Sequence, residues 1–336
     1  MRESSRSLAD DGEPALSSPI STSPRGAELL FVGDIYCDIV FAGVESPEVG
    51  AEVFASGFAI SPGGVANRAV AAARAGASTR LLSRLGEDPL GREVRSMLAS
   101  EPGLDLAWVH SLPDRQTPVS VSLTSAHNRS FITYYEELGP LMLPAEASLI
   151  GAVHVGVADE LPPWVADLRA AGTAVVGGVG WDSTGLWCPS VLDRLGELDV
   201  FVPNDVEAMR YTRSGSARAA AERLAELVPL AVVTRGKDGV VAVDSAAGEL
   251  VELPAVQVEV VDPTGAGDVF VATFMAARVH EDWDLATQLR FAGLNASLSV
   301  TGLGGAVSAP RRTDLIAFVA AHRPVGDWAF LADRLD

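Results

Sequence analysis

The chain has 336 residues, 48% of them hydrophobic, which suffices for one large α/β domain or two ordinary ones and excludes a disordered or fibrous protein. Acidic residues outnumber basic ones by 44 to 25. The resulting net charge of −19 repels phosphate backbones, so we expect no nucleic-acid partner.

Apolar runs such as residues 174–180 and 230–233 fall far short of the roughly 18 residues that a membrane-spanning helix requires, so we expect no membrane partner. Two cysteines and a start without an apolar core predict neither a disulfide framework nor a secretory signal, and therefore a cytoplasmic location. The single lysine, Lys237, is followed by Asp238 rather than Ser or Thr, which excludes the lysine-containing phosphate loop of many NTPases.

In chain order, residues 1–26 come first, and their seven serines, three prolines and lack of apolar periodicity predict a disordered tail. From residue 28 onward, short β-rich runs alternate with Ala- and Leu-rich stretches, which is typical of a parallel sheet covered by helices. Buried strands are predicted at residues 29–32, 152–155, 174–176, 200–202 and 230–233. Helices are predicted at residues 67–75, 90–99, 164–171, 217–227, 266–279 and 285–300.

Two segments, residues 39–60 and 117–135, alternate polar and apolar residues without an intervening helix. Such alternation is typical of antiparallel strands with one exposed face. We therefore expect an α/β domain over residues 27–325 with a small β-flap, followed by a C-terminal extension over residues 326–336.

Polar residues follow the first predicted strand and open the next helix. Asp34 and Asp38 can accept hydrogen bonds from a hydroxyl-rich ligand, although either could instead cap a turn. Gly63 and Gly64 precede the helix that contains Asn67, and a Gly-Gly pair before a helix by itself indicates only a turn.

Two later strands also end in polar residues. Asn204 and Glu207 lie one helical turn apart on one face, which could serve a ligand but is equally typical of an N-terminal capping box. Residues 234–239 follow the next strand, and their Lys-Asp-Gly sequence is also that of a plain hairpin turn.

The most informative segment is Asp-Pro-Thr-Gly-Ala-Gly-Asp at residues 262–268, where a strand ends, a glycine-rich turn follows and an apolar helix begins. Uncovered N–H groups at a helix N-terminus attract an anion, so this segment predicts a phosphate-binding end. Asp268 lies in the first helical turn, where it could take a proton from a hydroxyl that approaches the same anion. The alternative is that Asp268 is only a favourable first-turn acid.

This heptapeptide, together with the Gly63-Gly64 segment much earlier in the chain, resembles the PfkB or ribokinase-like family of ATP-dependent carbohydrate and nucleoside kinases. The resemblance extends over nearly the whole chain after residue 27. It implies a three-layer α/β/α fold with a central, mostly parallel sheet and a small β-flap that acts as a lid. It also implies that Asp268 is the catalytic base, and that the backbone of Gly265, Ala266 and Gly267 is the anion hole for the transferring phosphoryl group.

The same resemblance implies binding residues for each ligand. The acceptor would be held by Asp34, Asp38, Gly63, Gly64 and Asn67. ATP would be contacted by Asn204, Glu207, Thr234, Gly236, Gly239 and Asn295, and the first two would also order Mg²⁺ through water. A monovalent cation, K⁺, could be held by Asp262, Thr264, Ser299, Gly304 and Ser308. The chain departs from the family pattern in that two residues rather than three separate Gly64 from Asn67, and in that Gly302 replaces an arginine common in the cation loop.

The expected function is transfer of the γ-phosphoryl group of Mg-ATP to a hydroxyl of a free sugar or polyol. Because the chain has no evident cluster of basic groups for a sugar phosphate, we expect an unphosphorylated acceptor. One alternative is a nucleoside acceptor, whose base could stack on Tyr36, Phe58, Tyr134 or Tyr135. Another is a ligand-binding regulatory protein without turnover. Exposed flap edges predict a homodimer that forms through the lid.

Overall fold

The computed structural model describes residues 28–331, with gaps at residues 45–46, 125–128, 146, 148–149, 281 and 323–327. The predicted N-terminal tail, residues 1–26, lies outside the described residues, as does the predicted C-terminal extension except for residues 328–331. Within the described ranges, no helix is both long and apolar enough to cross a membrane.

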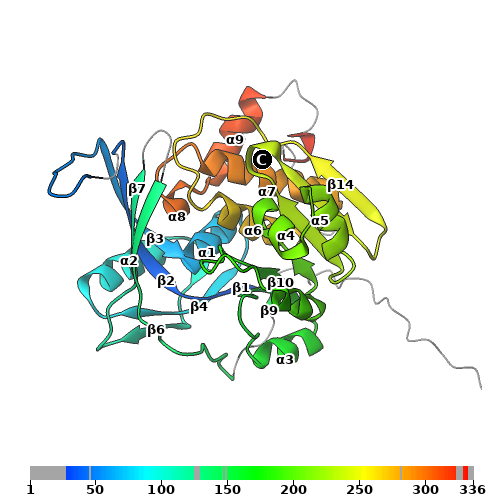
Figure 1. The fold of residues 1–336 in the computed structure, drawn as a ribbon, viewed down its shortest axis with the longest axis horizontal. Coiled ribbons are helices and arrows are strands. Elements are labelled where there is room, and N and C mark those ends of the chain that lie inside the picture. Colours follow the sequence, from blue (N-terminus) through cyan, green and yellow to red (C-terminus); the bar gives the residue numbers. More distant parts are fainter. Residues whose placement is uncertain are drawn as a thin grey trace, which may run out of the picture.

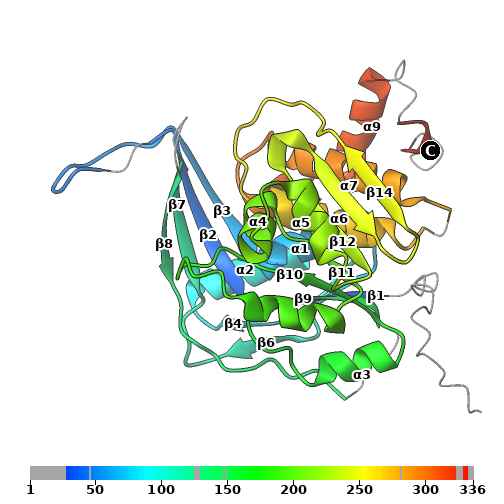
Figure 2. The ribbon, with the colours of Figure 1, turned by 45° about the vertical axis from the view of Figure 1, so that its right-hand side comes forward.

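A large sheet forms the centre of the molecule (Figures 1 and 2). Within the described residues its strand order is β14-β13-β12-β11-β10-β9-β1-β4-β5, with β6 also paired to β4. Neighbours from β12 to β5 are parallel, whereas β13 and β14 add an antiparallel hairpin at one edge. The strands are β1 (Glu28–Val32), β4 (Thr79–Gly86), β5 (Leu104–Asp105), β6 (Val109–Leu112), β9 (Ile150–Gly156), β10 (Ala174–Gly178), β11 (Val200–Phe201), β12 (Leu230–Thr234), β13 (Val240–Asp244) and β14 (Glu249–Leu253).

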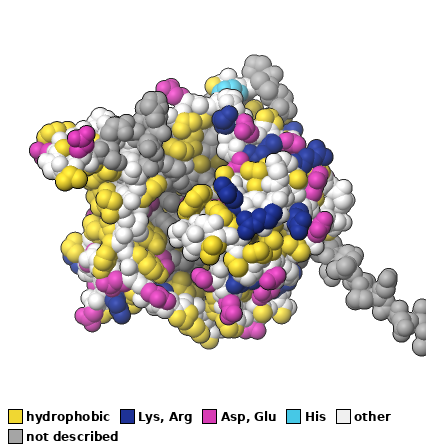
Figure 3. All heavy atoms as spheres, in the orientation of Figure 1, with side chains coloured by type: hydrophobic (Ala, Val, Ile, Leu, Met, Phe, Trp, Pro, Cys, Tyr) yellow, Lys and Arg dark blue, Asp and Glu magenta, His cyan; other side chains and the backbone are white. Residues whose placement is uncertain are grey.

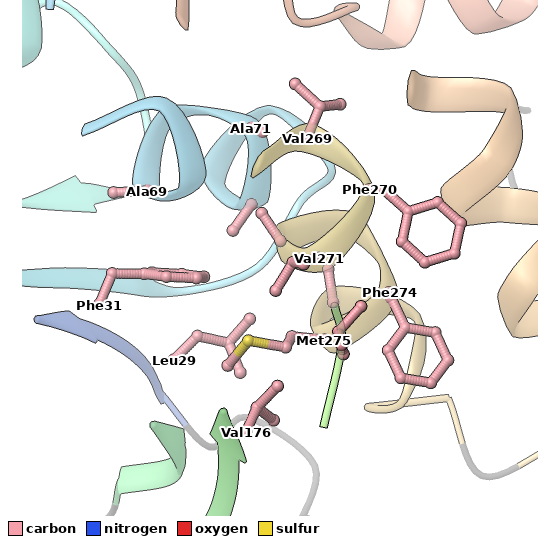
Figure 4. Packing of buried hydrophobic residues seen from close by; sticks show 14 of the residues in the cluster. Leu29, Phe31, Ala69, Ala71, Val176, Val269, Phe270, Val271, Phe274 and Met275 are labelled. Atoms are coloured by element: carbon pink, nitrogen blue, oxygen red, sulfur yellow. The ribbon is translucent and has the colours of Figure 1, made fainter. Parts of the chain in front are cut away.

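Strand β1 is buried on both faces of this sheet. Leu29 and Phe31 belong to one hydrophobic cluster and Leu30 to another, because successive side chains of a strand point to opposite faces. Figure 4 shows the first cluster, in which side chains of α1 and α6 pack against the sheet. That face is covered by α1 (Val65–Arg74), α2 (Pro89–Ala99), α6 (Ala266–Ala277) and α7 (Leu285–Ser299). The opposite face is covered by α3 (Trp164–Ala170), the 3₁₀ helix η1 (Pro189–Glu197), α4 (Asp205–Thr212) and α5 (Ala217–Leu224).

A third, smaller cluster lies where α7 meets α9 (Arg312–Ala321). Leu331, in the described part of the predicted C-terminal extension, is 2% exposed and belongs to this cluster with Trp283 and Leu315. The fold also contains the short helices η2 (Gly236–Asp238) and α8 (Gly305–Ser308).

The second sheet stands to one side of the body, as Figures 1 and 2 both show. Its order is β3-β2-β7-β8, formed by β2 (Ile35–Ala42), β3 (Gly57–Gly64), β7 (Val119–Thr124) and β8 (Arg129–Tyr134). The prediction of antiparallel strands is correct for β2–β3 and β7–β8 but wrong for β2–β7, which are parallel. The two hairpins are far apart in sequence, so the pattern within each segment could not reveal how they pair.

Candidate active site

Gly265 is the N-cap residue of α6, and its φ of 78° lies in the left-handed region that favours glycine. Among the described residues, no side chain caps this end of the helix. A Cβ added to Gly267 would meet no described atom within 4 Å, so this residue faces open space. Because uncapped N–H groups at a helix N-terminus carry partial positive charge, this end of α6 can accept an anion.

Helix α1 begins directly after β3, at the carboxyl end of β1. The Val65 N–H donates to the Asp34 carbonyl at 3.1 Å. Gly64 has a φ of 62°, and a Cβ there would lie 2.3 Å from the same carbonyl oxygen. A Cβ on Gly63 would lie 2.1 Å from Oδ2 of Asp38. The resemblance implied that both glycines help to hold the acceptor. In the structure, a side chain at Gly64 would strike the Asp34 backbone and one at Gly63 would strike the Asp38 carboxylate.

The Asp38 carboxylate lies over Gly63 in a partly buried, acidic environment. Burial, with the negative charges of Asp268 and Asp262, raises the pKa of Asp38 from 3.8 to about 7. Ser61 faces Asp38 across the β2–β3 pair, and its hydroxyl is buried without a hydrogen-bond partner among the described residues. Since unpartnered buried polar groups are costly, this side of the site is suited to a ligand that brings hydroxyl groups.

Asp268 is bonded to the N-terminal part of α1. Asn67 Nδ2 donates to Asp268 Oδ2 at 3.2 Å, and Arg68 Nη2 lies 2.7 Å from Asp268 Oδ1. Asn67 is 4% exposed, and its Oδ1 is buried without a hydrogen-bond partner among the described residues. The structure therefore joins a predicted acceptor residue to the predicted base. The sequence analysis missed Arg68, for which the only signal was its place beside Asn67.

An aromatic pair, Tyr36 and Tyr135, lies on the side of the site that carries Asp34 and Asp38. Tyr135 Oη donates to Asp34 Oδ2 at 3.0 Å, and the Tyr135 ring stacks on Tyr36 with centroids 6.1 Å apart. Tyr36 and Asp38 are two residues apart on β2, so both point to one face of the small sheet. Burial and the bond to Asp34 raise the pKa of Tyr135 to about 12, which keeps its phenol protonated as a donor.

Asn204 and Glu207 form a capping box at the start of α4, so this alternative interpretation of the pair is confirmed. The Glu207 N–H donates to Asn204 Oδ1, and the Asn204 N–H donates to Glu207 Oε2, both at 2.9 Å. Burial raises the pKa of Glu207, and the Arg68 charge partly opposes that rise. The box uses one carboxylate oxygen of Glu207, so the other could still bind a water molecule.

Of the other residues predicted to contact ATP, some lie beside the capping box and others serve the fold itself. Thr234 ends β12 and forms an isolated parallel bridge with Asn204, which places the turn at residues 234–239, with Gly236 in it, beside the capping box. The fold itself requires glycine at position 239, since a Cβ there would lie 2.0 Å from the Leu253 carbonyl oxygen. Asn295 is 1% exposed and donates to a carbonyl one turn earlier in α7, so its amide is not presented to a surface ligand.

The residues predicted to hold a monovalent cation are bonded mainly to the protein. Asp262 is 1% exposed; its Oδ1 accepts from the Thr264 N–H at 2.9 Å and hydroxyl at 2.6 Å, and its Oδ2 accepts from the Gly304 N–H at 3.1 Å. Ser299 and Ser308 donate to carbonyls three residues earlier. Asp262 therefore ties the turn before α6 to the loop before α8.

Together these contacts place the predicted acceptor residues Asp38 and Asn67 next to the uncapped N-terminus of α6. Asp268 lies between the two, where a carboxylate can take a proton from a hydroxyl that attacks a bound phosphoryl group. Within the described residues no group of three His, Cys, Asp or Glu side chains could hold a metal.

Comparisons with known proteins point to the same chemistry. A family model described as "pfkB family carbohydrate kinase" matches residues 27–312. A nucleoside kinase of Methanothermobacter thermautotrophicus is 30% identical over 295 residues, which cover 84% of this chain and 92% of the relative. The ribokinase of Bacillus subtilis is 27% identical over 298 residues, covering 85% and 97% of the two chains.

A solved structure, Arabidopsis thaliana ribokinase complexed with ribose and ATP, is also similar to this chain. It covers 88% of this chain and 99% of its own, with 26% identity and a TM-score of 0.74. The similarity confirms the predicted three-layer α/β/α fold with its small additional sheet.

Proposed function

This chain belongs to the pfkB family of carbohydrate kinases, and from that premise we propose that it transfers the γ-phosphoryl group of ATP to a hydroxyl of a free sugar or polyol. The observation that supports this most strongly is the bond between Asn67 and Asp268 at the uncapped start of α6. The Arabidopsis ribokinase complex with ribose and ATP supports the choice of donor and acceptor.

In the proposed reaction, Asp38 and Asn67 hold the acceptor and Asp268 takes the proton of its hydroxyl. The acceptor oxygen forms a bond to the γ-phosphorus while the bond to the bridging oxygen breaks, and ADP leaves with that electron pair. The backbone N–H groups of Gly265, Ala266 and Gly267 donate to the oxygens on which charge develops, and the Ala266 N–H gives up its 3.4 Å bond to the Pro263 carbonyl. A general base of this kind contributes roughly 10²–10⁴-fold to the rate.

Mg²⁺ would lie beside Asn204 and Glu207, held through water and through the phosphate oxygens of ATP. The residues fit such a role, because Mg²⁺ prefers oxygen ligands, keeps several waters and needs few protein groups beside a nucleotide. When bound, it neutralises phosphate charge. The turn at residues 234–239 would lie along the nucleotide, since Thr234 is bridged to Asn204.

A monovalent cation, K⁺, is a second component of the proposal. The buried carboxylate of Asp262, next to the Gly304 loop, is the group that would attract it. Because both of its oxygens already accept hydrogen bonds from the protein, a cation would draw most of its ligands from backbone carbonyls. Turnover should be compared in KCl and in choline chloride at equal ionic strength: faster turnover with K⁺ supports the site, and equal rates argue against it.

A nucleoside acceptor is the second candidate, favoured by the stacked pair Tyr36 and Tyr135 on the face that carries Asp38. An aromatic surface beside hydroxyl-binding carboxylates could stack a base while the ribose occupies the polar part of the site. The nucleoside kinase relative supports this candidate. Tight binding of a nucleoside but not of its free sugar would favour it.

We also infer that the small sheet is a lid over the acceptor and that two lids pair in a homodimer. Figure 3 shows hydrophobic side chains over the small sheet and a recess between this sheet and the body. Phe58, Phe131 and Ile132 are 60%, 52% and 67% exposed. Strand edges and apolar side chains of this kind favour pairing. Light scattering should therefore give a dimer mass, and a monomer at micromolar concentration would refute the pairing.

The test of the proposed function is ADP release from Mg-ATP with a panel of hexoses, pentoses, polyols, phosphosugars and nucleosides. We expect acceptor-dependent turnover with an unphosphorylated sugar or polyol. Turnover confined to nucleosides would favour the second candidate. Ligand binding without ADP release would instead favour a regulatory protein that keeps the fold.

A further inference from the structure

Arg68 contacts the proposed base but has no role in the mechanism above. Its Nη2 lies 2.7 Å from Asp268 Oδ1, and its side chain is 26% exposed. Asn67 donates to the other carboxylate oxygen, so each oxygen of the base already interacts with α1. An acceptor hydroxyl that gives its proton to Asp268 must therefore compete with α1 for this carboxylate.

The Arg68 guanidinium also acts on the nucleotide side of the site. Its positive charge partly opposes the burial that raises the pKa of Glu207, and it adds to the burial that lowers the pKa of His154 on β9. Its Nε is buried and has no hydrogen-bond partner among the described residues. Arg68 thus has a spare donor beside the proposed base.

The charge balance of the site also calls for a cation. The negative charges of Asp262 and Asp268 already act on Asp38, and ATP would add several more. The chain's only lysine, Lys237, lies in a turn with 88% of its side chain exposed. In phosphoryl-transfer enzymes that use one, an arginine on the transferring group accelerates the reaction by roughly 10³–10⁵-fold.

We propose that Arg68 is a further catalytic residue of this reaction, an inference that rests on the proposed kinase function. When ATP and the acceptor bind, the guanidinium leaves Asp268 and donates to the oxygens of the transferring phosphoryl group. One charge-assisted pair replaces another, and Asp268 Oδ1 becomes available for the proton of the acceptor hydroxyl. The bonds that form and break in the transfer are unchanged.

The kinetic test compares Arg68→Gln, Arg68→Lys and Arg68→Ala with wild type. The matched control is Arg218→Gln on α5, which removes an exposed arginine–carboxylate pair with Glu222. We expect Arg68→Gln to lower kcat by at least about 10²-fold while both KM values change by less than about threefold. Guanidinium ion, but not urea, should restore part of the activity of Arg68→Ala. An unchanged kcat, a loss confined to the KM of the acceptor, or no response to guanidinium would overturn the proposal.

A binding test separates this proposal from the kinase proposal itself. The probe is Mg-ADP with aluminium fluoride, which mimics the transferring phosphoryl group, and Mg-ADP alone is its reference. Arg68→Gln should bind the mimic at least about tenfold more weakly than wild type does, with equal affinity for Mg-ADP. Equal affinity for the mimic would overturn the role of Arg68 whether or not an acceptor supports turnover. A wild type that binds the mimic more tightly than Arg68→Gln does but supports no turnover would instead contradict the kinase function. If circular dichroism shows that Arg68→Gln is unfolded, Arg68→Lys takes its place in the same test. Arg68→Lys should then bind the mimic more weakly than wild type does, and equal affinity would overturn the proposal.

Discussion

Replacing Asp38 with asparagine should stabilise the protein at pH 8 while it abolishes acceptor binding. The carboxylate is partly buried and lies near Asp268 and Asp262, which together raise its pKa from 3.8 to about 7. A folded state with a raised carboxyl pKa binds its proton more tightly than the unfolded chain does. Stability therefore falls as the pH rises from about 4 to about 7, and the loss is complete above that window.

The magnitude follows from the pKa difference. At about 1.4 kcal/mol per pH unit, the interval from 3.8 to about 7 sets an upper limit of about 4 kcal/mol. Because solvent still reaches part of the group, we expect Asp38→Asn to gain about 1–3 kcal/mol in the free energy of unfolding at pH 8. The gain should be smaller at pH 5, where the wild-type carboxyl is protonated in the folded state.

Urea denaturation of wild type and Asp38→Asn at pH 5 and pH 8 measures both values. Asp159→Asn, which changes an exposed carboxylate, is the matched control and should leave the unfolding free energy nearly unchanged. A variant that is no more stable than wild type at pH 8, or whose gain is the same at both pH values, would refute the electrostatic reasoning. Calorimetry with the acceptor should detect no binding to Asp38→Asn.

Four further predictions concern the acceptor side and the capping box. Gly63→Ala should raise the KM of the acceptor at least about tenfold with little change in stability, since the three atoms nearest its Cβ all belong to the Asp38 carboxyl group, which can rotate away. Gly64→Ala should instead lose about 1–3 kcal/mol of stability, because Gly64 has a positive φ and its Cβ would strike a backbone carbonyl. Thermal melts measure the stability of both variants. Their control is Gly196→Ala, whose Cβ would meet no described atom within 4 Å. The KM of the acceptor should fall about tenfold between pH 6 and pH 8 as Asp38 ionises, and a flat profile would contradict its role. Asn204→Ala should cost about 1 kcal/mol in urea denaturation through loss of the capping box, and no loss would show that the box does not stabilise α4.

The periodicity of the sequence was enough to predict most of the central layers. Each of the five predicted strands coincides with a strand of the larger sheet, and each of the six predicted helices with a helix. The β13–β14 hairpin was not predicted, and three of the five residues of its second strand are exposed. The parallel pairing of β2 with β7 was also beyond reach, since strand pairing across long separations depends on tertiary packing rather than on local pattern.

The candidate site could be predicted in its parts but not in its contacts. The heptapeptide at residues 262–268 indicated the open start of α6, and the resemblance led to the family now confirmed. No local pattern could show that Arg68 contacts Asp268, because the two lie in distant segments. Asn295 and Gly239 were predicted from their place in the motifs, whereas the structure gives both of them reasons internal to the fold.

The central claim is that Asp268 takes the proton of an acceptor hydroxyl at an open helix N-terminus. The most direct test is the kcat of Asp268→Asn for the acceptor found in the panel, measured beside its affinity for Mg-ATP. We predict that kcat falls by at least about 10²-fold while the affinity for Mg-ATP stays within about threefold of wild type. A variant that turns over at the wild-type rate would contradict the assignment of Asp268 as the base, and with it this account of the site.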